Sequence, residues 1–174
     1  MDSAPKRRQE VGELFQKHRS SLFNMIARLI GNYDEAHDVL QETFLKAMQG
    51  WGQFRGQAEP RTWLYRIALN CSYSHLKKAQ SRSRTVDGVL TACVPAESAG
   101  SEQTLLQKER SQLVEMALQS LKPGFRTLVV LRDLEGLSYA EIADVLGCST
   151  GTVASRLNRA RHLLARKLKE LGVV

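Results

Sequence analysis

Apolar residues recur at the spacing of an α-helix through most of this 174-residue chain. They fall three or four positions apart across residues 11–29 and again across residues 36–48, which places them on one face of a helix. Pro60 is suited to the first turn of a third helix. The 12 glycines and four prolines lie mostly in the gaps between such runs, so the sequence predicts an all-α protein.

One long segment interrupts this pattern. Residues 81–104 lose the helical periodicity and are rich in Ser, Ala, Gly and Thr, a composition typical of a flexible linker. We therefore expect two small helical domains, residues 1–80 and residues 105–174, joined by a flexible linker over residues 81–104. With 43% hydrophobic residues, the chain can form real cores.

The second domain carries the signals of a helix-turn-helix. Ser138 and Glu141 have the spacing of a capping box, in which a hydroxyl and a carboxylate each bind a free backbone N–H. The short helix that follows is expected to end at Gly147, and Ser149 is placed to cap a long final helix. A short helix, a tight glycine turn and a long basic helix together predict this motif.

The long final helix is expected to turn polar and basic side chains toward solvent or the major groove of DNA. Arginine can pair with guanine and asparagine with adenine. A plain helical hairpin with a solvated basic face is the alternative interpretation. The outward residues are Thr150, Thr152, Ala154, Ser155, Arg156, Asn158 and Arg159.

The net charge of +7 indicates an anionic partner more by its placement than by its size. Residues 55–84 hold seven Lys and Arg against one acid, and residues 150–174 hold six against one. Between these blocks, residues 85–104 contain three acids and neither Lys nor Arg. Two basic blocks separated by an acidic spacer suggest two contacts on one polyanion.

The three cysteines are scattered, which predicts neither a disulfide framework nor a zinc module. Cys71 and His75 lie four positions apart on a predicted helix, but two ligands do not make a metal site. We expect no cofactor. No apolar run approaches the roughly 20 residues of a membrane span, and no apolar segment follows the basic start, so no membrane insertion and a cytoplasmic protein are expected.

Two groups of motifs resemble the bacterial sigma-70 family. D-E-A-H-D-V-L-Q-E-T-F-L-K-A-M, W-x-x-F-R-G and T-W-L-Y-R-I-A-L-N, in this order, resemble its region 2. L-S-Y-A-E-I-A-D-V-L-G-C-S-T-G-T-V-A-S-R-L-N-R-A-R resembles its region 4. The resemblance spans roughly residues 10–170, and the small size with a direct linker resembles the extracytoplasmic-function (ECF) group. It implies a non-enzymatic factor that directs promoter-specific transcription initiation.

The resemblance implies that the acidic helix of region 2 binds a basic coiled coil of the β′ subunit. Core RNA polymerase, through β′ and β, is therefore an expected partner. The alternative is an acidic face that is merely solvated. The residues implied in polymerase binding are Asp34, Glu35, Asp38, Val39, Gln41 and Glu42.

Members of this family bind the −10 element as single-stranded DNA, with one base held outside the stack. Aromatic side chains and cations suit such a strand, since they stack on bases and contact phosphates. Trp63 is expected in the core, and the place of Tyr65 is left open. The chain lacks the fuller aromatic set of primary sigma factors, so we expect weak melting at poor promoters. The residues implied here are Phe54, Arg55, Arg61, Arg66, Asn70, Ser72, Tyr73 and Lys77.

Region 4 of the family binds the −35 element as duplex DNA. Position 154, often basic in the family, is alanine here, so the sequence that is read cannot be carried over. The matching residues are Ser149, Thr152, Ala154, Ser155, Arg156, Asn158 and Arg159.

Other functions compete with this interpretation. A free-standing helix-turn-helix repressor or activator explains the second domain but leaves the motifs of the first without a task. An enzyme acting on nucleic acid would need a Walker lysine loop, an H-E-x-x-H motif or clustered carboxylates, and none is present. Asp133 and Glu135 are expected as capping and solvent contacts at a helix end. The resemblance further implies an anti-sigma partner that covers both domains and a location at the nucleoid.

Overall fold

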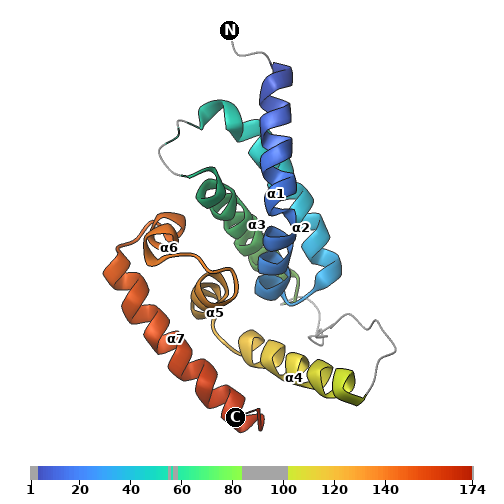
Figure 1. Ribbon diagram of the computed structural model, residues 1–174, viewed down its shortest axis with the longest axis vertical. Coiled ribbons are helices and arrows are strands. Elements are labelled where there is room, and N and C mark those ends of the chain that lie inside the picture. Colours follow the sequence, from blue (N-terminus) through green and yellow to red (C-terminus); the bar gives the residue numbers. More distant parts are fainter. Residues whose placement is uncertain (1–3, 55, 57–58, 84–101, 174) are drawn as a thin grey trace.

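The computed structural model describes residues 4–54, 56, 59–83 and 102–173 (Figure 1). Helices are the only regular elements in these ranges, which confirms the all-α prediction. In chain order they are α1 (Ala4–Ile30), α2 (Tyr33–Gly50), the 3₁₀ turn η1 (Trp51–Gln53), α3 (Pro60–Ser83), α4 (Glu102–Gln119), α5 (Pro123–Val129), the π-helical turn η2 (Val130–Leu134), α6 (Tyr139–Leu146) and α7 (Thr150–Glu170).

The N-terminal half is a bundle of α1, α2 and α3. Its core joins Leu22 and Met25 of α1 to Leu40 of α2 and Leu64 of α3. The turn between α1 and α2 is closed by Asn32, whose side chain accepts hydrogen bonds from the N–H groups of Asp34 and Glu35 in the first turn of α2. This cap fixes the start of the acidic helix relative to α1.

In the C-terminal half, α7 packs across α5 and α6. Val153 and Leu157 of α7 are fully buried, as are Leu128 of α5 and Ile142 of α6. η2 continues α5 without a break until Gly136, whose φ of 71° lies in the left-handed region that glycine adopts readily. The short helix α6 follows this turn.

The predicted linker is shorter than expected at both ends. α3 continues to Ser83 and α4 begins at Glu102, so helix occupies the first three and last three positions of residues 81–104. The remaining positions of the predicted linker, residues 84–101, lie outside the described residues.

The two halves pack against each other: α6 lies beside α3, and α4, α5 and η2 contact α1 (Figure 1). One continuous set of buried apolar residues spans both halves. Arg126, almost fully buried in α5, joins them further. Its guanidinium donates to the carbonyl of Leu29 in α1 at 2.7 Å and to the carbonyls of Leu118 and Gln119 in α4 at 3.0 and 2.6 Å. The halves therefore form one closed unit.

Among the described residues, none of the helices combines the length and the apolar character that crossing a membrane requires.

Candidate nucleic-acid and polymerase interfaces

The predicted helix-turn-helix is present, with its caps formed. The Ser138 hydroxyl accepts from the Glu141 N–H at 3.2 Å, and the Glu141 carboxylate accepts from the Ser138 N–H at 2.7 Å. The Ser138 backbone N–H, and after it the Ser138 hydroxyl, stabilises the Glu141 carboxylate and lowers its pKa. Gly147 ends α6 in a left-handed conformation, and the Ser149 hydroxyl then accepts from the Thr152 N–H at 3.2 Å to begin α7.

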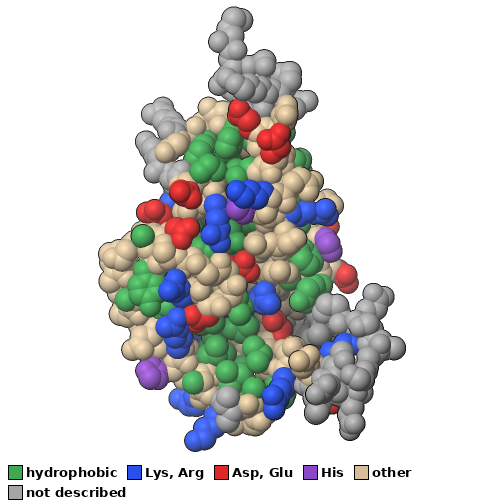
Figure 2. Space-filling view, in the orientation of Figure 1, with side chains coloured by type: hydrophobic (Ala, Val, Ile, Leu, Met, Phe, Trp, Pro, Cys, Tyr) green, Lys and Arg blue, Asp and Glu red, His purple; other side chains and the backbone are tan. Residues whose placement is uncertain are grey.

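α7 buries a single stripe and leaves its other faces to solvent. The buried stripe consists of Val153, Leu157 and Ala160. The helix lies on the side of the C-terminal half away from α1 and α3, and Lys and Arg side chains gather along it (Figures 1 and 2). The residues predicted to contact duplex DNA lie on α7 or its cap, exposed or half-buried: Ser149, Thr152, Ala154, Ser155, Arg156, Asn158 and Arg159.

Contacts made by two arginine side chains hold α7 and α6 in place. Arg161 of α7 pairs with the carboxylate of Asp133 in η2 through two guanidinium nitrogens. Arg132 donates to the Leu137 carbonyl at 2.7 Å, and its guanidinium carbon lies 5.2 Å from the centre of the Tyr139 ring. Asp133 is exposed to solvent as expected, but its carboxylate does not cap a helix end: it pairs with a residue 28 positions further along the chain.

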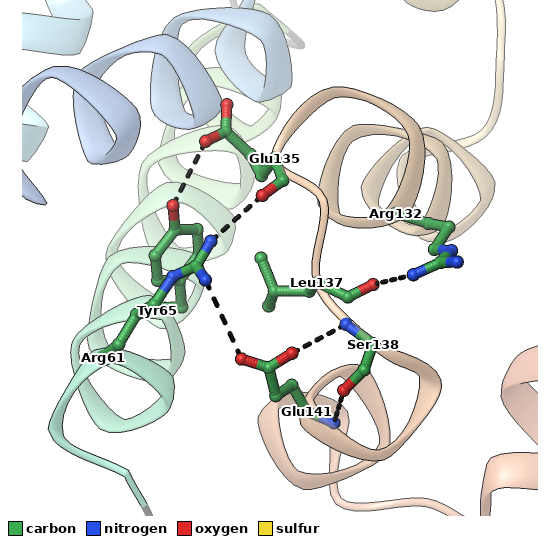
Figure 3. A network of polar contacts seen from close by, with 7 residues as sticks. All are labelled: Arg61, Tyr65, Arg132, Glu135, Leu137, Ser138 and Glu141. Atoms are coloured by element: carbon green, nitrogen blue, oxygen red, sulfur yellow. Dashed lines mark hydrogen bonds and ion pairs between the residues drawn. The ribbon is translucent and has the colours of Figure 1, made fainter.

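Glu135 also differs from the expected solvent contact. Its side chain is only 7% exposed, since it is covered by the N-terminal half. The carboxylate accepts from the Tyr65 hydroxyl at 3.1 Å (Figure 3). It also lies 3.9 Å from a guanidinium nitrogen of Arg28. Burial raises the pKa of Glu135, although Tyr65 and the two arginines Arg28 and Arg61 act in the opposite direction.

The acidic surface of α2 is exposed as expected, with one exception. Asp34, Glu35, Asp38 and Gln41 are exposed and Glu42 is half-buried. Val39 is 1% exposed and packs in the bundle core. The structure thus corrects the assignment of Val39 as a polymerase contact, because a side chain at this position of the helix faces α1 and α3.

A groove of about 450 Å³ lies between α1 and α2 beside this acidic surface. Its walls include Phe15 and Arg19 of α1, and Gln41, Phe44 and Leu45 of α2. Leu45 is 59% exposed, the most exposed of the large apolar side chains that the structure describes. The acidic surface and the apolar groove together offer a partner both charge and contact area.

The acidic helix is tied to α3 and to its own next turn. A His75 ring nitrogen of α3 lies 2.6 Å from the Glu35 carboxylate. Lys46 lies 2.7 Å from the Glu42 carboxylate, and their hydrogen bond lowers the pKa of Glu42. Among the described residues, no group of three or more His, Cys, Asp or Glu side chains could hold a metal ion, and Cys71 beside His75 is buried.

A second cavity, of about 470 Å³, brings together two of the predicted −10 residues, Phe54 and Asn70. Trp63 also lines this cavity and is half-buried, so the core position expected for it is only partly correct. Trp63, Phe54 and Trp51 form a cluster with ring centres 5.1–5.5 Å apart. An aromatic wall beside an amide suits a flat base better than it suits an ion.

Two polar residues of this cavity, Lys46 and Gln53, were missed from the sequence. Gln53 lies inside the W-x-x-F motif, one position before Phe54, so its position in the sequence could have indicated that it lies near the cavity. Lys46 is the first cation after the acidic run of residues 34–45, which was interpreted only as a polymerase surface.

The remaining predicted −10 residues are not gathered at this cavity. Arg61, Arg66 and Tyr73 face the C-terminal half, and Lys77 is exposed further along α3. Arg55 lies outside the described residues. Ser72 is corrected: it is fully buried and its hydroxyl donates to the Ala68 carbonyl at 2.8 Å, so it has no surface to offer DNA.

Comparisons with known proteins match both halves. Residues 14–82 match the sigma-70 region 2 family, and residues 111–164 match sigma-70 region 4. The chain is 36% identical to the RNA polymerase sigma-H factor of Pseudomonas aeruginosa, over 91% of this chain and 86% of that protein. It is 34% identical to the ECF RNA polymerase sigma-E factor of Escherichia coli K12, over 94% and 95%.

Two solved structures share the arrangement. One is the sigma factor RpoE in complex with the anti-sigma factor NepR from Bartonella quintana, with a TM-score of 0.76, 28% identity and coverage of 92% of this chain and 98% of that one. The other is CnrH in complex with the cytosolic domain of CnrY, with a TM-score of 0.70, 25% identity and coverage of 96% and 95%.

Proposed function

The chain belongs to the sigma-70 family and is an ECF sigma factor that directs transcription initiation, and from this premise we propose which of its surfaces bind polymerase and promoter. The observation that carries the proposal is the presence of both regions, in order, on one short chain. A free-standing repressor or activator is not favoured, since it would leave region 2 without a role.

The exposed face of α7 binds the −35 element as duplex DNA. Arg156 and Asn158 are exposed on the recognition helix and supply the two side chains best suited to base edges. Ser149 and Thr152, at the N-terminus of α7, lie where backbone N–H groups favour a phosphate. Arg159 is steadied by Phe125, whose ring centre lies 5.8 Å from the guanidinium carbon.

The cavity beside α3 receives a base of the −10 strand. Phe54 and Trp63 offer ring faces for stacking, and Asn70 offers both a donor and an acceptor to the edge of the base. Arg61, Arg66, Tyr73 and Lys77 follow the strand along α3. The proposal leaves out Ser72 because it is buried.

The acidic surface of α2, formed by Asp34, Glu35, Asp38, Gln41 and Glu42, binds a basic coiled coil of the β′ subunit. Its support is the run of exposed acids on a helix of a chain that carries a net charge of +7. An anti-sigma factor is proposed as a second partner, because RpoE, a structural relative, is in complex with NepR. The site of action is the cytoplasm, at the nucleoid.

Charge reversal on α2 tests the polymerase surface. Asp38→Lys combined with Glu42→Lys is expected to abolish run-off transcription with core RNA polymerase, since two cations would then face a basic partner. Binding of −35 duplex DNA is expected to stay, because α7 is untouched. The matched control, Glu109→Lys with Glu170→Lys, makes the same change of charge at exposed sites of the C-terminal half. Equal transcription by both double variants would refute the assignment.

A further inference from the structure

The aromatic wall of the cavity proposed for the −10 base has a support that comes from outside the cavity. Phe54 and Trp63 line the cavity, and Trp51 stacks on Phe54 with ring centres 5.1 Å apart and ring planes 16° apart. The residues that line the cavity do not include Trp51. Its indole can therefore affect a bound base only through the rings that it contacts.

The 3₁₀ turn η1 makes this stack. The Phe54 N–H donates to the Trp51 carbonyl, three positions back, at 3.1 Å. Because a 3₁₀ helix has three residues per turn, side chains three positions apart lie one above the other. The segment W-G-Q-F thus brings its two rings together by local geometry, while Gly52 and Gln53 between them are exposed.

Local geometry does not fix where the two rings stand relative to α3. η1 is three residues long, and none of them is fully buried. The anchor comes from α1, which lies beside η1 (Figure 1). The Trp51 Nε1–H donates to the Glu10 carboxylate at 3.2 Å, across 41 positions of the chain. This bond ties the indole to a helix that does not line the cavity.

Trp63, the third ring of the cluster, is held from α2. Its ring meets the Trp51 ring edge-on, with centres 5.5 Å apart and planes at 62°. It also approaches Gly50 so closely that a Cβ there would lie 3.3 Å from Trp63 Cζ2. The backbone of α2 therefore limits Trp63, and Glu10 limits Trp51, before a base arrives.

A wall that is fixed in advance binds a base more tightly than a mobile one, because the base does not have to order the rings. Stacking on a ring also tolerates every base, since each base has a flat face. The anchor should therefore change the affinity for the strand by a similar factor whichever base is captured.

We propose that Glu10 and Trp51 are positioning residues of the −10 base cavity. The Glu10 carboxylate holds the Trp51 indole, and the indole holds Phe54 in the orientation that stacks on the base. Neither residue touches the DNA. The inference rests on the proposed function, because it takes a base of the −10 strand as the ligand of the cavity.

Glu10→Leu and Glu10→Gln test the anchor in the full chain bound to core polymerase. Both remove the negative charge and both suit a helix, but only glutamine keeps a carbonyl that can accept from the indole. The probe is a labelled single-stranded −10 oligonucleotide from a promoter that the wild-type chain transcribes. Glu10→Leu should bind it about threefold more weakly than Glu10→Gln, as expected for one exposed hydrogen bond. Equal strand affinities would overturn the proposal.

A fluorescent base in the probe gives a readout that a general structural defect would not reproduce. 2-Aminopurine, whose fluorescence falls when it stacks, is placed at single positions of the strand. The position at which Phe54→Ala raises the fluorescence most is the captured base. Glu10→Leu should raise it at that position alone, and Glu10→Gln should not. An equal rise at every position would show general weakening of the strand and would count against the anchor.

Trp51→Phe keeps a ring against Phe54 but removes the N–H. In this background the two Glu10 variants should bind the strand equally, since no donor remains. A persisting difference would place the action of Glu10 elsewhere and overturn the proposal.

Glu13→Leu and Glu13→Gln are the matched controls. Glu13 is exposed on α1, and its carboxylate accepts from Gln9 on the same helix. These two variants should not differ in strand affinity, and all of the Glu10 and Glu13 variants should bind −35 duplex DNA alike. If Phe54→Ala leaves strand binding unchanged, the base cavity itself is refuted. If Phe54→Ala weakens the strand and the Glu10 variants do not differ, the anchor alone is refuted.

Discussion

The two helices that we propose to bind DNA meet the rest of the molecule in opposite ways. α7 buries one narrow stripe, and its arginines at positions 156 and 159 are exposed. α3 lies between the two halves and is buried over a much wider arc, which includes Leu64, Tyr65 and Leu69. The comparison teaches that packing of the two halves covers much of α3, the helix proposed for the −10 strand, and leaves the exposed face of α7 open.

This difference bears on how a promoter could be engaged. The exposed face of α7 can bind duplex DNA while the halves are still packed together. We expect strand binding along α3 to displace the Glu135 carbonyl and the Glu141 carboxylate from Arg61. We therefore expect −35 binding to be insensitive to opening and −10 binding to depend on it.

The largest break in this comparison is expected from Arg126→Ala. It removes the buried guanidinium that binds backbone carbonyls of α1 and α4 and leaves those acceptors without a partner. We expect the free energy of unfolding to fall by about 3 kcal/mol or more, measured by urea denaturation. Arg110→Ala, at an exposed position of α4, should change it little. Equal stability of the two variants would show that Arg126 does not join the halves.

A smaller effect is expected from Arg156→Ala on the exposed face of α7. If this side chain pairs with a base, its loss should make the free energy of −35 duplex binding less favourable by about 1–3 kcal/mol. Fluorescence anisotropy at fixed salt measures this change. Strand affinity and the radius of gyration should not change. Arg166→Ala, on the same helix but nearer its end, is the control. The same loss on unrelated duplexes would reassign Arg156 to a phosphate.

The smallest effect concerns pH and sharpens the role of Glu135. Because burial raises the pKa of Glu135, the folded chain binds this proton more readily than the unfolded chain does. Its contribution to stability is therefore full at low pH and declines as pH rises through the raised pKa. Glu135→Gln, neutral at every pH, should gain stability relative to the wild type as pH rises, and Glu170→Gln should not. The free energy of unfolding of each variant is measured relative to the wild type from acidic to neutral pH. The same pH dependence for Glu135→Gln and Glu170→Gln would contradict this prediction.

Much of the second half followed from local sequence signals. The bounds of α6 and the capping box formed by Ser138 and Glu141 agree with the prediction, because a cap depends on residues three positions apart. The first helix was predicted from residue 11 but begins at Ala4, since its basic first turns carry no apolar stripe. Val39 was assigned to the polymerase surface through the resemblance, although its place on the apolar stripe of α2 puts it in the core.

The sequence by itself determined the helices, their caps and the separation of acidic from basic blocks, because helical period, capping and charge are encoded within a few neighbouring residues. Only the tertiary structure decided which of the basic residues are covered. The bond between Tyr65 and Glu135 joins positions 70 apart, and that between Arg126 and Leu29 joins positions 97 apart. Such contacts depend on how whole helices pack, so no local sequence pattern predicts them.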